Sequence, residues 1–237
     1  MPLEIACFNV ESAITAAKAG ADRIELCANG RLGGTTPSTA DFATLRNLLR
    51  TLPGTAALVP IHVMIRPRGG NFVYSPGEIA NMESSIEEFM GLDDGGPDGF
   101  VFGLLNEDGE VDGEGCIRLL DRKGGRACTF HRAFDSIPAG KRGEAVEEIL
   151  GLGFQGILTS GGANDAVGGK EVLAQLVRKV RGRGCMIIVG GGVRSRNLES
   201  LKEGIGAKWW HSSADVRGVG DANEEEVMRL VEMVESG

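Results

Sequence analysis

The sequence lacks the features that would define several other classes of protein. No apolar run approaches the roughly 20 residues needed to cross a bilayer. The N-terminus shows no basic region followed by an apolar one, so we expect neither a membrane span nor a signal peptide. Basic residues are outnumbered, 25 against 33 acidic ones, and the formal net charge of −8 argues against broad affinity for nucleic acid or membranes. We therefore expect a protein of the cytoplasm.

Cysteine is sparse and irregularly spaced. The five cysteines contain no C-x-x-C pair, which argues against a structural zinc site. An odd number of cysteines at irregular spacing also fits a cytosolic protein. We expect Cys116, Cys128 and Cys185 to be small buried apolar residues.

What the sequence does contain is a regular alternation of short apolar segments with helical patterns, about 30 residues per repeat, which is the size of a βα unit. The predicted strands are Leu3–Cys7, Arg23–Cys27, Ile61–Arg66, Gly99–Leu105, Ala127–Arg132, Gly156–Ser160, Met186–Gly191 and Lys208–Ser213. The predicted helices are Val10–Ala19, Thr39–Leu49, Gly77–Met90, Gly113–Arg122, Glu144–Leu150, Val167–Val180, Ser195–Glu203 and Asn223–Glu235.

This alternation implies parallel strands joined by right-handed crossovers. Eight such units close into a (β/α)8 TIM barrel, and we predict this α/β fold as a single domain over residues 1–237. An open doubly wound sheet is the alternative. The barrel is favoured because the strand count is eight and because no early strand leads into a G-x-G-x-x-G turn. We expect no nucleotide cofactor.

Polar residues gather where the predicted strands end. Strands covered on both faces should be almost wholly apolar, and the carboxyl ends of barrel strands form the mouth in which active sites lie. The residues predicted there for catalysis are Glu25, Arg66, His131, Arg132, Asp135 and His211, and those predicted for ligand binding are Arg68, Ser160, Gly191, Gly192 and Ser212.

Strand parity predicts which of these residues share the barrel interior. Alternate residues of a strand face the interior and the surrounding helices. A glutamate packs poorly against an apolar helix layer, so Glu25 should face inward, and Cys27 with it. The same parity places Met64 and Arg66 in one inward set and His131 in another. This mixture suits anion binding with proton transfer; the alternative is a closed structural network in which Glu25 pairs with Arg66.

Two glycine-containing loops add to the predicted mouth. The segment Val189–Arg194 is a glycine-rich turn before a helix, and barrels often bind phosphate at the loops after strands seven and eight. A tight turn that needs positive φ is the alternative interpretation. The segment Ile65–Ser75 is long for a βα loop, so its Arg68 would belong either to a lid or anion clamp or to a solvated loop without function.

Several motifs in one order resemble the CutC family. They are GADRIELC (Gly20–Cys27), GGTTPS (Gly33–Ser38), VMIRPRGG (Val63–Gly70), TFHRAFD (Thr129–Asp135), LTSGG (Leu158–Gly162) and GGGVR (Gly190–Arg194). The resemblance runs from Leu3 to about Ala214. It implies a cytosolic (β/α)8 barrel, a role in copper homeostasis through copper(I) binding, and self-association into a homo-oligomer.

The copper role implied by this resemblance needs soft sulfur ligands. Members credited with copper binding carry a cysteine at the end of each of the first two strands, so Cys7 and Cys27 are the candidate metal ligands. Cys27 matches the second position, whereas the first falls on Ala6, one residue before Cys7. Such a shift turns a side chain to the opposite face of a strand. Met64 shares the inward set, where core packing is the favoured role and that of a substitute ligand is the alternative.

The sequence thus leaves two functions open. One is a copper homeostasis protein that binds the copper(I) ion. The other is an isomerase or lyase that acts on a small anionic or phosphorylated ligand, in which Arg66 and Arg132 hold the anion, Glu25 or His131 moves a proton, and Asp135 orients a neighbour. A barrel used only as an interaction scaffold would leave the charged mouth without an explanation.

Overall fold

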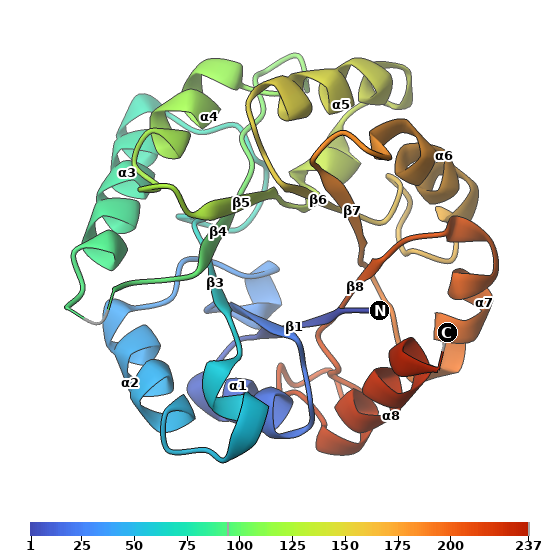
Figure 1. The fold of residues 1–237 in the computed structure, drawn as a ribbon. Helices are drawn as coiled ribbons and strands as arrows, with labels where there is room; N and C mark the ends of the chain where they lie inside the picture. The colour runs from blue at the N-terminus through green and yellow to red at the C-terminus, as the bar shows by residue number, and fades with distance from the viewer. Residues whose placement is uncertain (94, 237) are drawn as a thin grey trace.

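The structure is a computed structural model that describes residues 1–93 and 95–236, and it confirms the predicted closed barrel (Figure 1). Neighbouring strands pair in parallel and in sequence order, and β8 closes the ring on β1. The strands are β1 (Leu3–Cys7), β2 (Arg23–Leu26), β3 (Ile61–Met64), β4 (Gly99–Phe102), β5 (Ala127–Phe130), β6 (Gly156–Thr159), β7 (Met186–Val189) and β8 (Trp209–Ser212). Most of them end one to three residues earlier than predicted, because the polar residues that follow belong to the mouth loops.

Helices form a ring around the strands (Figure 1). They are α1 (Val10–Lys18), α2 (Thr39–Leu49), α3 (Pro76–Met90), α4 (Gly113–Leu120), α5 (Arg142–Gly151), α6 (Lys170–Val180), α7 (Ser195–Ile205) and α8 (Glu224–Glu235). Short 3-10 helices add η1 (Gly30–Leu32), η2 (Gly54–Leu58), η3 (Arg132–Ser136) and η4 (Ala139–Lys141). Among the described residues, none of these helices has the length and apolar character needed to cross a membrane.

Local sequence explains where the helices start. The Ser38 hydroxyl accepts a hydrogen bond from the Asp41 N–H at 3.0 Å and so caps α2. Ser75 and Glu78 form a reciprocal capping box at α3, and Pro76 occupies the first turn, where its missing N–H has no cost. These caps set the starts of both helices, which the sequence predicted to within one residue.

The alternation of side chains across β1 and β2 gives the barrel two different cores. Leu3, Ile5 and Cys7 are buried in the layer between the strands and the helices. The intervening residues point the other way, since β1 and β2 are in register with Glu4 beside Arg23 and Ala6 beside Glu25. The barrel interior on this side is therefore polar, and it leads up to the mouth.

Candidate functional site

A cavity of about 230 Å³ opens at the carboxyl ends of the strands. Its walls combine acid and base groups, three guanidinium groups, two sulfur atoms and several small residues. They are Glu25, His131 and His211; Arg66, Arg132 and Arg194; Cys27 and Met64; Ala6, Gly33, Gly191, Gly192, Ser212 and Ser213; and the apolar Phe8, Phe72 and Leu158. The predicted mouth therefore exists as one cavity.

The deepest part of the site is a chain of buried charged groups. Arg23 donates to Glu4, and the other Glu4 oxygen lies 2.7 Å from His211 Nδ1. Burial alone would raise the pKa of Glu4, but the charge of Arg23 and the His211 contact outweigh it and hold this pKa well below its usual value. Burial likewise opposes a charge on His211, but the contact with Glu4 and the nearby Glu25 raise its pKa. The contact with Glu4 thus favours the charged form of His211.

Glu25 is the carboxylate of this chain of groups that faces the cavity. Its Oε2 lies 3.7 Å from His211 Nε2, which is too long for a hydrogen bond, and its buried Oε1 has no partner within the described chain. Burial raises the pKa of Glu25 to about 7, with His211 opposing the shift and Glu4 adding to it. A carboxyl group with such a pKa exchanges protons near neutrality, as a general acid or base must.

Arg66 and His131 form the wall on the β3 and β5 side. The Arg66 guanidinium donates to the carbonyls of Leu32 and Gly34 at 2.9 Å, and lies over the Phe72 ring at 4.9 Å. It does not pair with Glu25, so the closed network that the sequence left open is not formed. His131 accepts from the Ala133 N–H, and burial with the nearby Arg66 lowers its pKa to about 3, so this imidazole is neutral.

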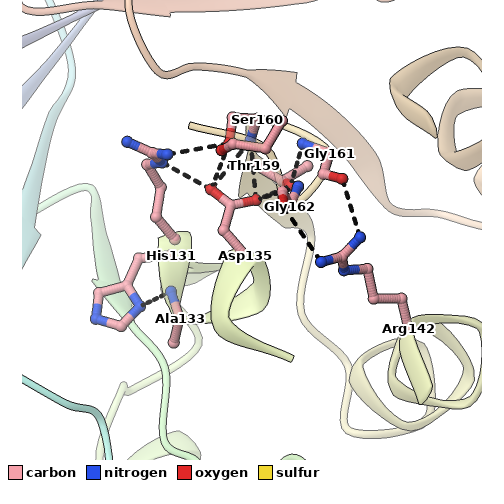
Figure 2. Close-up of polar contacts among 10 residues, drawn as sticks. His131, Ala133, Asp135, Arg142, Thr159, Ser160, Gly161 and Gly162 are labelled. Atoms are coloured by element: carbon pink, nitrogen blue, oxygen red, sulfur yellow. Dashed lines mark hydrogen bonds and ion pairs between the residues drawn. The ribbon is translucent and has the colours of Figure 1, made fainter. Parts of the chain in front are cut away.

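Asp135 supports the cavity from behind and does not line it. Figure 2 shows its carboxylate at the centre of a network, in which it accepts from the Arg132 Nε at 2.7 Å and from the backbone N–H groups of Ser160 and Gly162. The Arg142 guanidinium clamps the same loop by donating to the carbonyls of Gly161 and Gly162. Asp135 therefore fixes the position of the Arg132 guanidinium.

The wall on the β7 and β8 side is built around Arg194. Its guanidinium donates to the Ser212 and Ser213 hydroxyls at 3.1 and 3.0 Å, which fixes it at the edge of the cavity. Gly191 and Gly192 both adopt positive φ. A methyl group added to Gly191 would lie 2.9 Å from the Ser160 Cβ and 3.2 Å from the Arg132 guanidinium carbon, so this position needs glycine for space as well as for conformation.

The two sulfur atoms at the cavity come from Cys27 and Met64, which pack together with Val101 and Phe8. Burial raises the pKa of the Cys27 thiol well above its usual value, and Glu25 adds to the shift. Cys7 lies elsewhere: its side chain is buried in the helix-facing core, although its carbonyl accepts from the Cys27 N–H at 2.8 Å. The structure does not bring the two predicted metal ligands together at the cavity.

Two of the residues predicted for ligand binding also lie away from the cavity. Arg68 donates to Glu78, to Asn71 and to the Val73 carbonyl, which orders the long loop after β3. Ser160 lies behind the cavity, where its hydroxyl donates to the Ala163 carbonyl at 2.6 Å and accepts from the Arg132 Nη2. Both side chains hold loops in place.

Glu4 and Arg23 are the functional residues that sequence reasoning missed. The signal was present, because Glu4 lies in the middle of an apolar strand that is covered by helices, and the parity argument used for Glu25 applies to it equally. Phe72 was missed for a different reason. It lies in a loop, and loop sequence does not predict that its ring packs edge-on against His131 at 5.0 Å between ring centres.

Glu4, Glu25 and His211 offer one ligand atom each within 4.8 Å of one another. Both oxygens of Glu4 already have partners, Arg23 and His211, so an ion here would have to displace an existing pair. Carboxylate and imidazole ligands suit harder divalent ions, whereas copper(I) prefers sulfur. These three groups therefore fit copper(I) less well than Cys27 and Met64 do.

Fold and site together define a TIM-barrel protein with a polar ligand site at the carboxyl ends of its strands. Residues 1–216 match the sequence-family model that is described as the CutC family. The chain belongs to the CutC family.

Relatives and a solved structure agree with this assignment. The human protein named copper homeostasis protein cutC homolog is 40% identical over 212 residues, which cover 90% of this chain and 72% of that protein. A family protein CutC from Porphyromonas gingivalis is 41% identical over 213 residues, covering 90% and 80%. The crystal structure of CutC from Streptococcus agalactiae has a TM-score of 0.81 at 32% identity, covering 90% of this chain and 98% of that one.

Proposed function

We propose that this protein acts in copper homeostasis by binding one copper(I) ion in the cavity, with Cys27 and Met64 as ligands. The observation that carries the proposal is that these two sulfur-bearing side chains belong to one small cluster at the cavity wall. Thiolate and thioether sulfur are the ligands that copper(I) favours. The names of the human and mouse relatives support the same role.

Cys7 is the other sulfur that resemblance to the family suggests. Its side chain faces the helix layer, so its participation would need β1 to turn over at its last residue. Met64 already faces the cavity beside Cys27 and needs no such rearrangement. We therefore propose Met64 as the second ligand.

Anaerobic titration with copper(I) in competition with a chromogenic chelator tests this proposal. We expect one ion per chain, a loss of more than about 10-fold in affinity for Cys27→Ser, and a smaller loss for Met64→Leu. Cys185→Ser is the matched control, because this partly exposed thiol lies just before β7, at the opposite end of the barrel. A Cys27→Ser variant that binds as tightly as the parent rules the proposal out, and a loss in Cys7→Ala with none in Met64→Leu replaces Met64 by Cys7.

The second candidate function is an acid–base enzyme of the isomerase or lyase type that acts on a small anionic molecule. The observation that favours it is the buried Glu25 carboxylate, which faces the cavity with an oxygen that has no hydrogen-bond partner among the described residues. His211, fixed by Glu4, lies beside it. A positioned carboxylate next to a held imidazole is the arrangement that proton transfer needs.

Proton exchange tests the second candidate. Small phosphorylated hydroxyketones are incubated with the protein in D2O, and deuterium incorporation next to the carbonyl is followed by NMR. We expect incorporation by the parent and none by Glu25→Gln, with Glu225→Gln, an exposed carboxylate on α8, as the control. Equal incorporation by the parent and by Glu25→Gln would remove Glu25 from the mechanism.

We also propose a cytoplasmic location and self-association. The location is supported by the five cysteines, all of which are unpaired thiols, as is usual in a reducing compartment. Self-association rests on resemblance to the family. Light scattering coupled to size-exclusion chromatography measures it directly, and a mass of 25.0 kDa at micromolar concentration would contradict it.

A further inference from the structure

Two guanidinium groups at the cavity have hydrogen-bond partners that carry no charge. Arg66 is only 5% exposed, and its hydrogen bonds go to the carbonyls of Leu32, Gly34 and Gly70. Its Nε is buried and has no partner in the part of the chain that the structure describes. A buried charge without a counter-charge destabilises a fold unless a bound ligand or ion provides the opposite charge.

Arg194 repeats this pattern on the opposite wall. Its four hydrogen bonds go to two serine hydroxyls and to the carbonyls of Val193 and Asp215. The acidic groups that act on Arg194 are Glu226 and Asp215, and Glu226 accepts from the Ser195 N–H and hydroxyl at 2.7 Å. Arg132, the third guanidinium, is paired with Asp135 through Nε, while its Nη1 donates to no described residue. The cavity lining therefore holds three guanidinium groups and one carboxylate, Glu25.

Backbone donors lie next to these charges. The N–H groups of Gly191 and Gly192 donate to no other residue of the described chain, and both glycines line the cavity. Gly191 packs directly against the Arg132 guanidinium, because a methyl group added to Gly191 would lie 3.2 Å from the guanidinium carbon. Free N–H groups, a guanidinium and a serine hydroxyl that line one cavity are donors suited to an oxyanion.

We infer that the β7–β8 side of the cavity is a phosphate subsite, formed by Arg194, Arg132, Ser213 and the N–H groups of Gly191 and Gly192. A dianionic phosphate would supply the charged hydrogen-bond partner that Arg194 lacks. The loops after the seventh and eighth strands are the common location for phosphate in barrels of this fold. The N-terminus of α7 itself is not the site, since the Glu226 carboxylate already occupies it.

The ligand class that this subsite fits is a phosphate monoester. The cavity has a volume of about 230 Å³, and Gly192 and Arg194 also line a neighbouring pocket. A ligand held by its phosphate at β7 and β8 would extend toward Glu25 and His211, which line the same cavity. In naming this substrate class the inference rests on the second candidate function, but phosphate binding itself requires neither catalysis nor copper.

Calorimetric and thermal-shift titrations of the full chain with inorganic phosphate and with glycerol 3-phosphate test the subsite. We expect saturable binding of one phosphate per chain and a rise in Tm of roughly 5–10 °C at a hundredfold excess over Kd. Arg132→Gln and Arg194→Lys should each weaken binding at least about tenfold, because each removes a forked donor. Two variants are used because Arg194 also braces the β8 loop.

Arg217→Gln is the matched control, since this arginine lies on the β8–α8 loop with a side chain 69% exposed and is absent from the cavity wall. Unchanged phosphate affinity in Arg217→Gln supports the inference, and saturable phosphate binding that persists in Cys27→Ser and in Glu25→Gln separates it from copper binding and from catalysis. No saturable phosphate binding by the folded parent, parental affinity in both Arg132→Gln and Arg194→Lys, or tighter binding of succinate than of phosphate overturns it.

Discussion

His211 and Glu4 meet in the barrel interior with 2.7 Å between Nδ1 and Oε1, joined across the closing seam between β8 and β1. The two residues are 207 positions apart in the chain, and the contact exists only when the ring of strands is closed. The Glu4 carboxylate also accepts a hydrogen bond from Arg23. The Arg23 guanidinium stacks on Trp209, 4.0 Å from the ring centre. One carboxylate therefore contacts both the Arg23 guanidinium and the His211 imidazole.

Glu4→Gln should strongly destabilise the protein. The substitution leaves the buried Arg23 guanidinium without its charged hydrogen-bond partner, whereas His211 keeps Glu25 3.7 Å away. Removal of one partner from a buried ion pair costs about 3–5 kcal/mol. Urea denaturation followed by circular dichroism measures this loss. Glu225→Gln breaks an exposed pair with Arg229 and should change the free energy of unfolding by less than about 0.5 kcal/mol. A Glu4→Gln protein as stable as this control would contradict the role assigned to Glu4.

His131 should make the protein less stable in mild acid. Its folded pKa is lowered by burial and by Arg66 from 6.5 to about 3, so between these values the unfolded chain binds a proton that the folded chain does not. The stability that His131 contributes is thus complete above pH 6.5, and about 1.4 kcal/mol of it is lost per pH unit as the pH falls toward 3.

The difference between the parent and His131→Gln isolates this effect from other titrating groups such as His62 and Glu25. Denaturation midpoints are measured from pH 7.5 to 4.5, and the parent should lose its advantage over the variant as the pH falls. Parallel curves for the two proteins would mean that His131 does not titrate as described.

Gly191→Ala should destabilise the fold more than the same substitution at a glycine where the added methyl group contacts no neighbouring atom and only the backbone is strained. Gly182 has a similar positive φ of 76° but no atom within 4 Å of an added methyl group, so Gly182→Ala measures the strain alone. At Gly191 the methyl group also collides with Ser160 and Arg132, and we expect about 1 kcal/mol more. Equal shifts in Tm for the two variants would show that Ser160 and Arg132 move aside at no cost in stability.

Asp135→Asn should loosen the cavity wall from behind. The amide places a donor where the carboxylate now accepts from Arg132 or from the loop after β6, and a donor left without an acceptor costs about 1–3 kcal/mol. Phosphate affinity should fall as well, because Arg132 loses its orientation. Asp108→Asn, at an exposed carboxylate, is the control for both measurements. A variant with parental phosphate affinity would limit Asp135 to a structural role.

Fold and cavity were predictable from sequence to different extents. The barrel followed from eight apolar segments alternating with helices, and Glu25 and Cys27 were placed at the mouth by parity alone, because a strand has only two faces. Arg68 and Ser160 were assigned to the ligand, yet hydrogen bonds within their loops turn them away from the cavity. The partners of a loop side chain depend on where neighbouring loops lie, and no periodic pattern encodes that.

For the proposed copper role, the positive groups that share the cavity wall with Cys27 have a consequence for copper delivery. The guanidinium groups of Arg66, Arg132 and Arg194 share the cavity wall with Cys27, and their field repels a bare monovalent cation. An anionic complex, such as copper(I) carried between two thiolates of a small donor molecule, is attracted by the same field. Ligand exchange from such a carrier, slowed by added salt, is therefore the uptake route that this charge pattern favours, and transfer rates that do not vary with ionic strength would speak against it.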